Sequence, residues 1–139
     1  MSTWGLAGAV FVGSGLGGVC RYGVSLLGLR LLSARLTAPW PALTGTLAVN
    51  LVGSLVLGWL VSRQLSSGAG VDGNFMRFAA VRLGVMTGFM GGFTTYSTFN
   101  TELLTLMQSG RNREAGMYLA TTAGLCLLGG WVGMSLGSS

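Results

Sequence analysis

Four long apolar stretches constrain this chain more than any other feature of its sequence. They lie approximately at residues 4–29, 43–62, 75–107 and 115–136. The second and fourth contain no charged residue, and the first is interrupted only by Arg21. Each is long enough to cross a bilayer, which takes about 20 apolar residues in a helix, and none shows the alternation of a membrane strand. We therefore expect an all-α integral membrane protein with four transmembrane helices per protomer, in one membrane domain over residues 1–139.

The charged residues agree with a multi-pass protein of the cell membrane. Only 8% of the residues are charged, whereas a soluble domain carries about 25%. The eight basic residues are all arginines and are scattered singly along apolar sequence. That pattern is typical of helix-end anchors and not of a nucleic-acid-binding surface. The chain also lacks the acid, base and nucleophile sets of a soluble enzyme, so we expect neither enzymatic activity nor a nucleic-acid partner.

Small residues recur at helical spacing in three of the stretches. The recurring positions are Gly13 with Gly17, Ser54 with Gly58, and the series Gly84, Gly88 and Gly92. Such faces let helix backbones approach closely in a membrane. The sequence leaves open whether they pack within one protomer or between two.

Arginine placement hardly selects an orientation in the membrane. The connections after the first and third stretches carry Arg30, Arg35, Arg111 and Arg113. The opposite side carries Arg63 and Arg77, with Arg82 close by, partly offset by Asp72. Four arginines against about three is a weak bias under the positive-inside rule.

The third stretch contains the segment GFMGGFTTYSTFNTE, residues 88–102, which is unusually polar for a membrane helix. Gly91 and Gly92 each lower helix propensity by about 1 kcal/mol relative to alanine, and the hydroxyls of Thr94 and Thr95 can bond freed backbone groups. We predict that this helix is broken near Gly91–Thr95. A break at membrane depth is tolerated where it is buried in protein or lines a wet cavity, and broken helices recur at ion sites.

Aromatic residues at positions 89, 93, 96 and 99 step by four, three and three. This spacing predicts one helical ridge through Phe89, Phe93, Tyr96 and Phe99. Such a ridge is compatible with core packing. The alternative is that the ring edges, which carry the positive part of the aromatic quadrupole, face an anion.

Two further polar sets lie on the neighbouring stretches. Asn50 is far from any charge in the second stretch, with Thr46 one turn earlier. A lone asparagine in hydrocarbon must hydrogen-bond, so it is either an interhelical contact or a pore donor. In the fourth stretch, Tyr118, Thr122 and Cys126 follow at i, i+4 and i+8, which forms a thin polar line on an apolar helix.

Three blocks together resemble the Fluc/CrcB fluoride-channel family. They are GGVCRY at 17–22, GTLAVNLVGSLVLG at 45–58 and GFMGGFTTYSTFNTE at 88–102. The resemblance implies a fluoride-selective channel that exports fluoride passively down its electrochemical gradient and so relieves fluoride toxicity. It further implies an antiparallel dual-topology dimer, either of this chain or with a paralogue of opposite orientation, with two pores at the interface.

The resemblance also implies roles for individual residues. The implied fluoride pathway consists of Asn50, Thr46, Tyr96, Phe99, Ser97, Thr98, Tyr118, Thr122, Cys126 and Arg21. A structural Na⁺ at the dimer centre is implied to bind the backbone carbonyls of Gly91 and Thr94. Glu102 matches the acid that follows the third block. Two residues depart from the family pattern: Tyr96 stands where phenylalanine is usual, and Cys126 stands where a hydroxyl is frequent.

Two other functions fit a four-span membrane protein. A small proton-coupled multidrug exporter needs a titrating group inside the membrane, and only Glu102 can serve here. A non-transporting membrane scaffold accounts for the glycine faces but leaves Asn50 and the Thr/Ser cluster unexplained. For Arg21, attraction of an anion at a pore mouth and simple snorkelling to the interface are both open.

Overall fold

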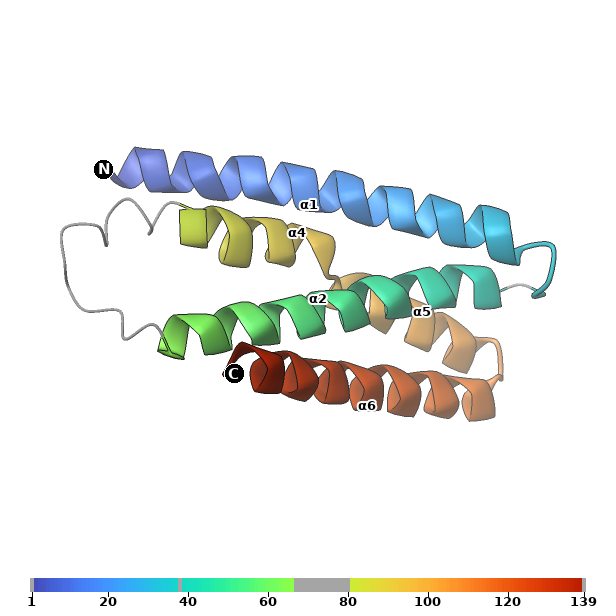
Figure 1. Ribbon diagram of the computed structural model, residues 1–139. Helices are drawn as coiled ribbons and strands as arrows, with labels where there is room; N and C mark the ends of the chain where they lie inside the picture. The colour runs from blue at the N-terminus through green and yellow to red at the C-terminus, as the bar shows by residue number, and fades with distance from the viewer. Residues whose placement is uncertain (1, 38, 67–80, 139) are drawn as a thin grey trace.

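The structure is a computed structural model and describes residues 2–37, 39–66 and 81–138 (Figure 1). These residues fold into helices joined by short connections, and no strand occurs among them. The elements are α1 (Thr3–Leu32), α2 (Trp40–Ser66), the π-helix η1 (Leu83–Phe89), α4 (Met90–Phe93), α5 (Tyr96–Gln108) and α6 (Asn112–Gly137). The expectation of an all-α architecture is confirmed for the described residues.

Three helices in the described part of the chain are long and apolar enough to cross a membrane. They are Thr3–Leu32, Trp40–Arg63 and Asn112–Gly137, with mean hydropathies of 1.4, 1.7 and 1.5. They contain the predicted spans 4–29, 43–62 and 115–136 and extend them by a few residues. The third predicted span, 75–107, corresponds to η1, α4 and α5, which run in succession along the bundle (Figure 1). Its first residues, 75–80, lie outside the described residues.

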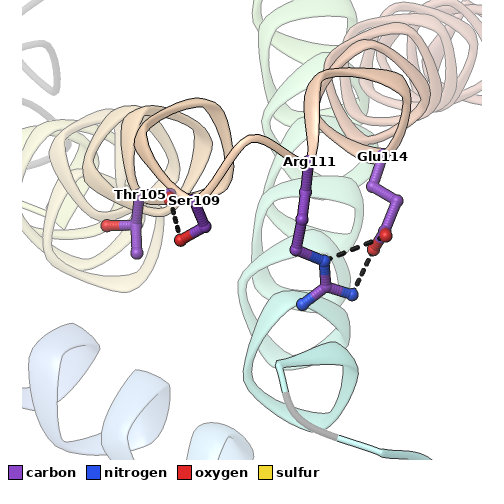
Figure 2. Close-up of polar contacts among 4 residues, drawn as sticks. All are labelled: Thr105, Ser109, Arg111 and Glu114. Atoms are coloured by element: carbon purple, nitrogen blue, oxygen red, sulfur yellow. Dashed lines mark hydrogen bonds and ion pairs between the residues drawn. The ribbon is translucent and has the colours of Figure 1, made fainter.

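The helix ends follow ordinary capping chemistry. The Ser2 side chain accepts a hydrogen bond from the Gly5 N–H at the start of α1. Between α5 and α6 the chain turns at Gly110, whose φ of 75° suits glycine, and the Arg111 N–H bonds the Leu106 carbonyl at 2.9 Å. Figure 2 shows the Arg111 guanidinium paired with the carboxylate of Glu114 in the first turn of α6, where negative charge is favourable.

The glycine faces pack inside the protomer. A Cβ atom added at Gly13 or Gly17 of α1 would overlap the backbone of η1, and one at Gly92 would overlap the Ser14 carbonyl of α1. On the other side of the bundle, a Cβ at Gly58 of α2 would overlap the Gly130 carbonyl of α6. The pairing of α1 with η1 and α4, and of α2 with α6, therefore uses these small residues for close backbone approach.

The break in the third span lies later than the glycines. Gly91 and Gly92 are helical in α4, so the expectation that they open the helix is wrong. The chain leaves helical geometry at Thr94 (φ −82°, ψ 161°) and Thr95 (φ −153°, ψ 116°). The physical reason is that a low helix propensity is overridden by packing, since Gly92 is in tight contact with α1. The predicted break near Gly91–Thr95 is confirmed, and it occupies the last two residues of that interval.

Candidate functional site

Asn50 of α2 binds both backbone polar groups of Thr95 at the break. Its Nδ2 donates to the Thr95 carbonyl at 3.1 Å, and the Thr95 N–H donates to its Oδ1 at 2.8 Å. The amide oxygen thus replaces the hydrogen bond that the Thr95 N–H loses at the break, and the amide N–H adds a bond to the carbonyl of Thr95, the N-cap residue of α5. The sequence left open whether Asn50 is an interhelical contact or a pore donor. These two bonds make it an interhelical contact. A side-chain amide has a second N–H, and Asn50 also lines the cavity described below.

Hydroxyl groups of the third block form further hydrogen bonds at the break. The Thr95 Oγ1 accepts from the Thr98 N–H at 3.2 Å and so caps α5, and it donates to the Thr98 Oγ1 at 2.9 Å. Ser97 places its Oγ 3.4 Å from the same Thr95 oxygen. The Thr94 hydroxyl donates back to the Met90 carbonyl at 2.9 Å. Among these contacts, the Thr95 hydroxyl satisfies the Thr98 N–H, a backbone donor that the break exposes.

A cavity of about 450 Å³ opens beside the break, between α2, α5 and α6. Its wall brings together five of the predicted pathway residues: Asn50, Tyr96, Phe99, Thr122 and Cys126. Thr122 is 5% exposed, and its hydroxyl has no hydrogen-bond partner among the described residues. A buried hydroxyl without a partner is costly, and this oxygen is enclosed by protein although Thr122 is among the residues that line the cavity.

The aromatic residues form two pairs instead of one ridge. Phe89 and Phe93 stack on the α1 side of the break with ring centroids 5.9 Å apart. Beyond the break, Phe99 lies 6.0 Å from Tyr96 and 5.2 Å from Tyr118, centroid to centroid. The ridge expectation is wrong because the extended Thr94–Thr95 residues interrupt the helical period. Phe99 is buried, whereas Tyr96 is 78% exposed on the surface of the protomer.

Glu102 joins three helices through its carboxylate. The Thr46 hydroxyl of α2 donates to its Oε1 at 2.9 Å, and the Tyr118 hydroxyl of α6 donates to its Oε2 at 2.7 Å. Thr46 and Tyr118 are both buried. The sequence singled out all three residues without linking them. The available signal was that an acid at membrane depth must find donors, and few hydroxyls are placed to provide them.

Arg21 borders a second, smaller cavity on the other side of the break. This cavity has a volume of about 240 Å³ and is lined in part by Arg21, Ser25, Thr46, Thr95 and Thr98. Thr95 lines both cavities. Most of the predicted pathway residues thus line one of two cavities that meet at the break, Arg21 the second, whereas Ser97 and Tyr118 line neither.

The carbonyls of Gly91 and Thr94 lose the N–H groups that a continuous helix would direct to them. The N–H of Thr95 bonds Asn50, and the N–H of Thr98 bonds the Thr95 hydroxyl. Hard backbone oxygens of this kind suit a cation such as Na⁺.

Sequence reasoning missed Gly53 of α2. This glycine lines the larger cavity, the one that also contains Asn50, and it lies directly against the Thr94 side chain.

Comparison with known proteins identifies the family to which the chain belongs. Residues 8–134 match the family described as CrcB-like protein, Camphor Resistance (CrcB). A protein of Coxiella burnetii named fluoride-specific ion channel FluC is 34% identical over 92% of this chain and 94% of its own length. Proteins of the same name from Rhizobium etli and Methylobacterium nodulans are 37% and 40% identical; each match covers 91% of this chain, and 91% and 90% of their own lengths. With three apolar helices among the residues that the structure describes, this is a multi-pass protein of the cell membrane, and the chain belongs to the CrcB-like protein family.

Proposed function

We propose that this chain is the subunit of a fluoride-selective channel that lets fluoride leave the cell passively and so limits its toxicity. The observation that carries the proposal is the cavity beside the Thr94–Thr95 break, in a chain whose relatives are named fluoride-specific ion channels. Its wall combines Asn50 with the rings of Tyr96 and Phe99, and Thr122 is also among its lining residues.

This donor set suits a small, strongly hydrated anion. Fluoride enters a pore only where several donors replace its water, and it leaves only where no fixed charge traps it. An amide N–H, hydroxyl groups and ring edges are all uncharged donors. Arg21 lies outside this cavity and lines the other one, so its cation is available to attract anions without lying on the donor wall.

The proposed assembly is an antiparallel dual-topology dimer. Tyr96, Ser97 and Thr98 are exposed on the surface of the protomer in the middle of the third span, where lipid offers no partner for hydroxyls. A second copy, or a wet path formed with it, resolves that cost. The near balance of arginines between the two sides favours insertion in both orientations.

A structural Na⁺ at the dimer centre is part of the same proposal. The opened carbonyls of Gly91 and Thr94 would hold it, and a second copy would supply an equal pair. When bound, the ion would supply a fixed positive charge that favours a passing anion in a medium of low dielectric. The protein's own contribution is to keep these carbonyls out of the helical hydrogen-bond ladder, which the Asn50 and Thr95 side chains do.

Neither alternative function gains support. A proton-coupled exporter would use Glu102, yet both of its carboxylate oxygens accept hydroxyl donors from neighbouring helices. A scaffold would leave the polar wall without a purpose.

Efflux from proteoliposomes tests the proposal. Purified protein is reconstituted into vesicles loaded with potassium fluoride or potassium chloride, and release is followed by an ion-selective electrode after valinomycin is added. We expect rapid fluoride release and chloride release no faster than from empty vesicles. Release that requires a proton gradient would favour the exporter, and no release by a folded dimer would favour the scaffold.

A further inference from the structure

The break is held from the side of α2 by two positions one turn apart. Asn50 binds the backbone of Thr95. Gly53, three residues later, faces the side chain of Thr94. A Cβ atom added at Gly53 would overlap the Thr94 Cγ2 methyl and come within 3.6 Å of the Phe93 ring. The space that glycine leaves open on α2 is therefore filled by this one methyl group.

Thr94 cannot turn its methyl away without loss. Its Oγ1 donates to the Met90 carbonyl at 2.9 Å, and a change of χ1 rotamer that moved the methyl would also move the hydroxyl off this carbonyl. A larger residue at position 53 therefore pushes on a side chain that is anchored to α4. The displacement must pass into the backbone of Thr94 and Thr95, whose extended geometry sets the start of α5.

The start of α5 places the aromatic wall of the cavity. Tyr96 is the first residue of this helix, and Phe99 follows one turn later against Tyr118. Gly53, Thr94, Tyr96 and Phe99 all line the same cavity. A shift at Thr94 consequently moves the rings relative to Asn50 and Thr122 on the opposite wall.

We propose that Gly53 is a positioning residue of the fluoride pathway. It seats the Thr94 methyl group and, with Asn50, fixes the direction in which α5 leaves the break. The inference rests on the proposed channel function and assigns a role within the same site. It differs from ordinary glycine packing, because the added Cβ at Gly58 would meet a backbone carbonyl of α6, whereas the added Cβ at Gly53 meets a methyl that a substitution can remove.

This difference defines a double-mutant cycle. Thr94→Ser deletes the methyl and keeps the hydroxyl that bonds Met90. Gly53→Ala is made in the Thr94 background and in the Thr94→Ser background, and fluoride efflux per folded dimer is measured together with the unfolding midpoint in detergent. We expect Gly53→Ala to lower efflux by about 10-fold or more beside Thr94, because small misplacements at a site are costly. In the Thr94→Ser background the loss should shrink to about three-fold or less.

Two alanine substitutions serve as matched controls. Gly58→Ala should lower the midpoint to the same extent in both backgrounds, because its clash is with the backbone of α6. Gly8→Ala on α1, where an added Cβ meets no atom within 4 Å, should change neither measurement.

The outcomes separate the proposals. An equal loss from Gly53→Ala in both backgrounds, or no loss beside Thr94, would overturn the role of Gly53. If Gly53→Ala does not fold, recovery of a folded dimer by adding Thr94→Ser supports the role, and failure of the double variant to fold while Thr94→Ser folds overturns it. If the unsubstituted protein releases no fluoride, the channel proposal fails. Even then, an unfolding midpoint that Gly53→Ala lowers and Thr94→Ser restores would establish the contact between Gly53 and the Thr94 methyl group.

Discussion

Asn50 and Thr95 exchange two hydrogen bonds across the α2–α5 contact, with one polar end of the amide on each backbone group. This arrangement makes the asparagine part of the break as well as part of the cavity wall. The two roles are compatible, because an amide N–H that is not used on Thr95 can face the cavity. They also predict that small chemical changes at position 50 have large effects.

Asn50→Asp should abolish most fluoride flux. The aspartate still accepts from the Thr95 N–H, but it loses the donor to the Thr95 carbonyl and adds negative charge to the path. Repulsion of about 3 kcal/mol in a partly polar site corresponds to a loss of about 100-fold in flux. The lost hydrogen bond should lower the stability by about 1–3 kcal/mol. Efflux and size-exclusion chromatography measure the two effects.

The control for this variant is Asn112→Asp, the same change at the exposed first residue of α6. It should leave flux and assembly intact, since negative charge is favourable at a helix N-terminus. Normal flux through an assembled Asn50→Asp dimer would remove Asn50 from the fluoride pathway.

Phe99→Ile should slow fluoride release by about 10-fold without unfolding the protein, because isoleucine keeps the bulk but has no ring edge to offer an anion. The lost ring contacts with Tyr96 and Tyr118 should cost about 0.5–1.5 kcal/mol. Phe93→Ile is the matched control, since Phe93 is also buried in an aromatic pair but does not line the cavity beside the break. Comparable slowing by both variants would reduce Phe99 to core packing.

The sequence predicts the spans well and the site only in part. The membrane helices follow from the charge-free stretches, because length and apolar composition decide whether a segment can span a bilayer. The break follows to within a few residues, but its exact position at Thr94 and Thr95 does not, because that depends on contacts with Asn50 and Gly53 of another helix and not on the propensity of Gly91 and Gly92. The contact of Glu102 with two hydroxyls is likewise tertiary, and no spacing along the chain contains it.

Insertion in both orientations should be sensitive to a few charges. Two lysines introduced between residues 63 and 74 should bias every copy toward one orientation under the positive-inside rule. If the active unit is antiparallel, flux should be lost, and co-expression with a copy biased the other way should restore it. Accessibility labelling of the termini measures orientation, and efflux measures function. Full activity of a uniformly oriented protein would argue for parallel assembly.

Gly91→Val tests the dimer centre, because this position is open within the protomer. Gly91 is exposed, and an added Cβ meets no protomer atom within 4 Å. Valine is also a better helix former than glycine by a few tenths of a kcal/mol, so α4 itself has no reason to unfold. A large effect must therefore come from a second copy facing the same residue.

We expect the Gly91→Val variant to shift from dimer to monomer and to lose fluoride flux. The unfolding midpoint of the unsubstituted protein should rise when Na⁺ replaces a bulky organic cation, and the variant should not show this rise. Gly116→Val, at another exposed and open glycine on α6, should keep all three properties. A Gly91→Val protein that remains dimeric, conducts fluoride and responds to Na⁺ would place the dimer contact and the cation site elsewhere.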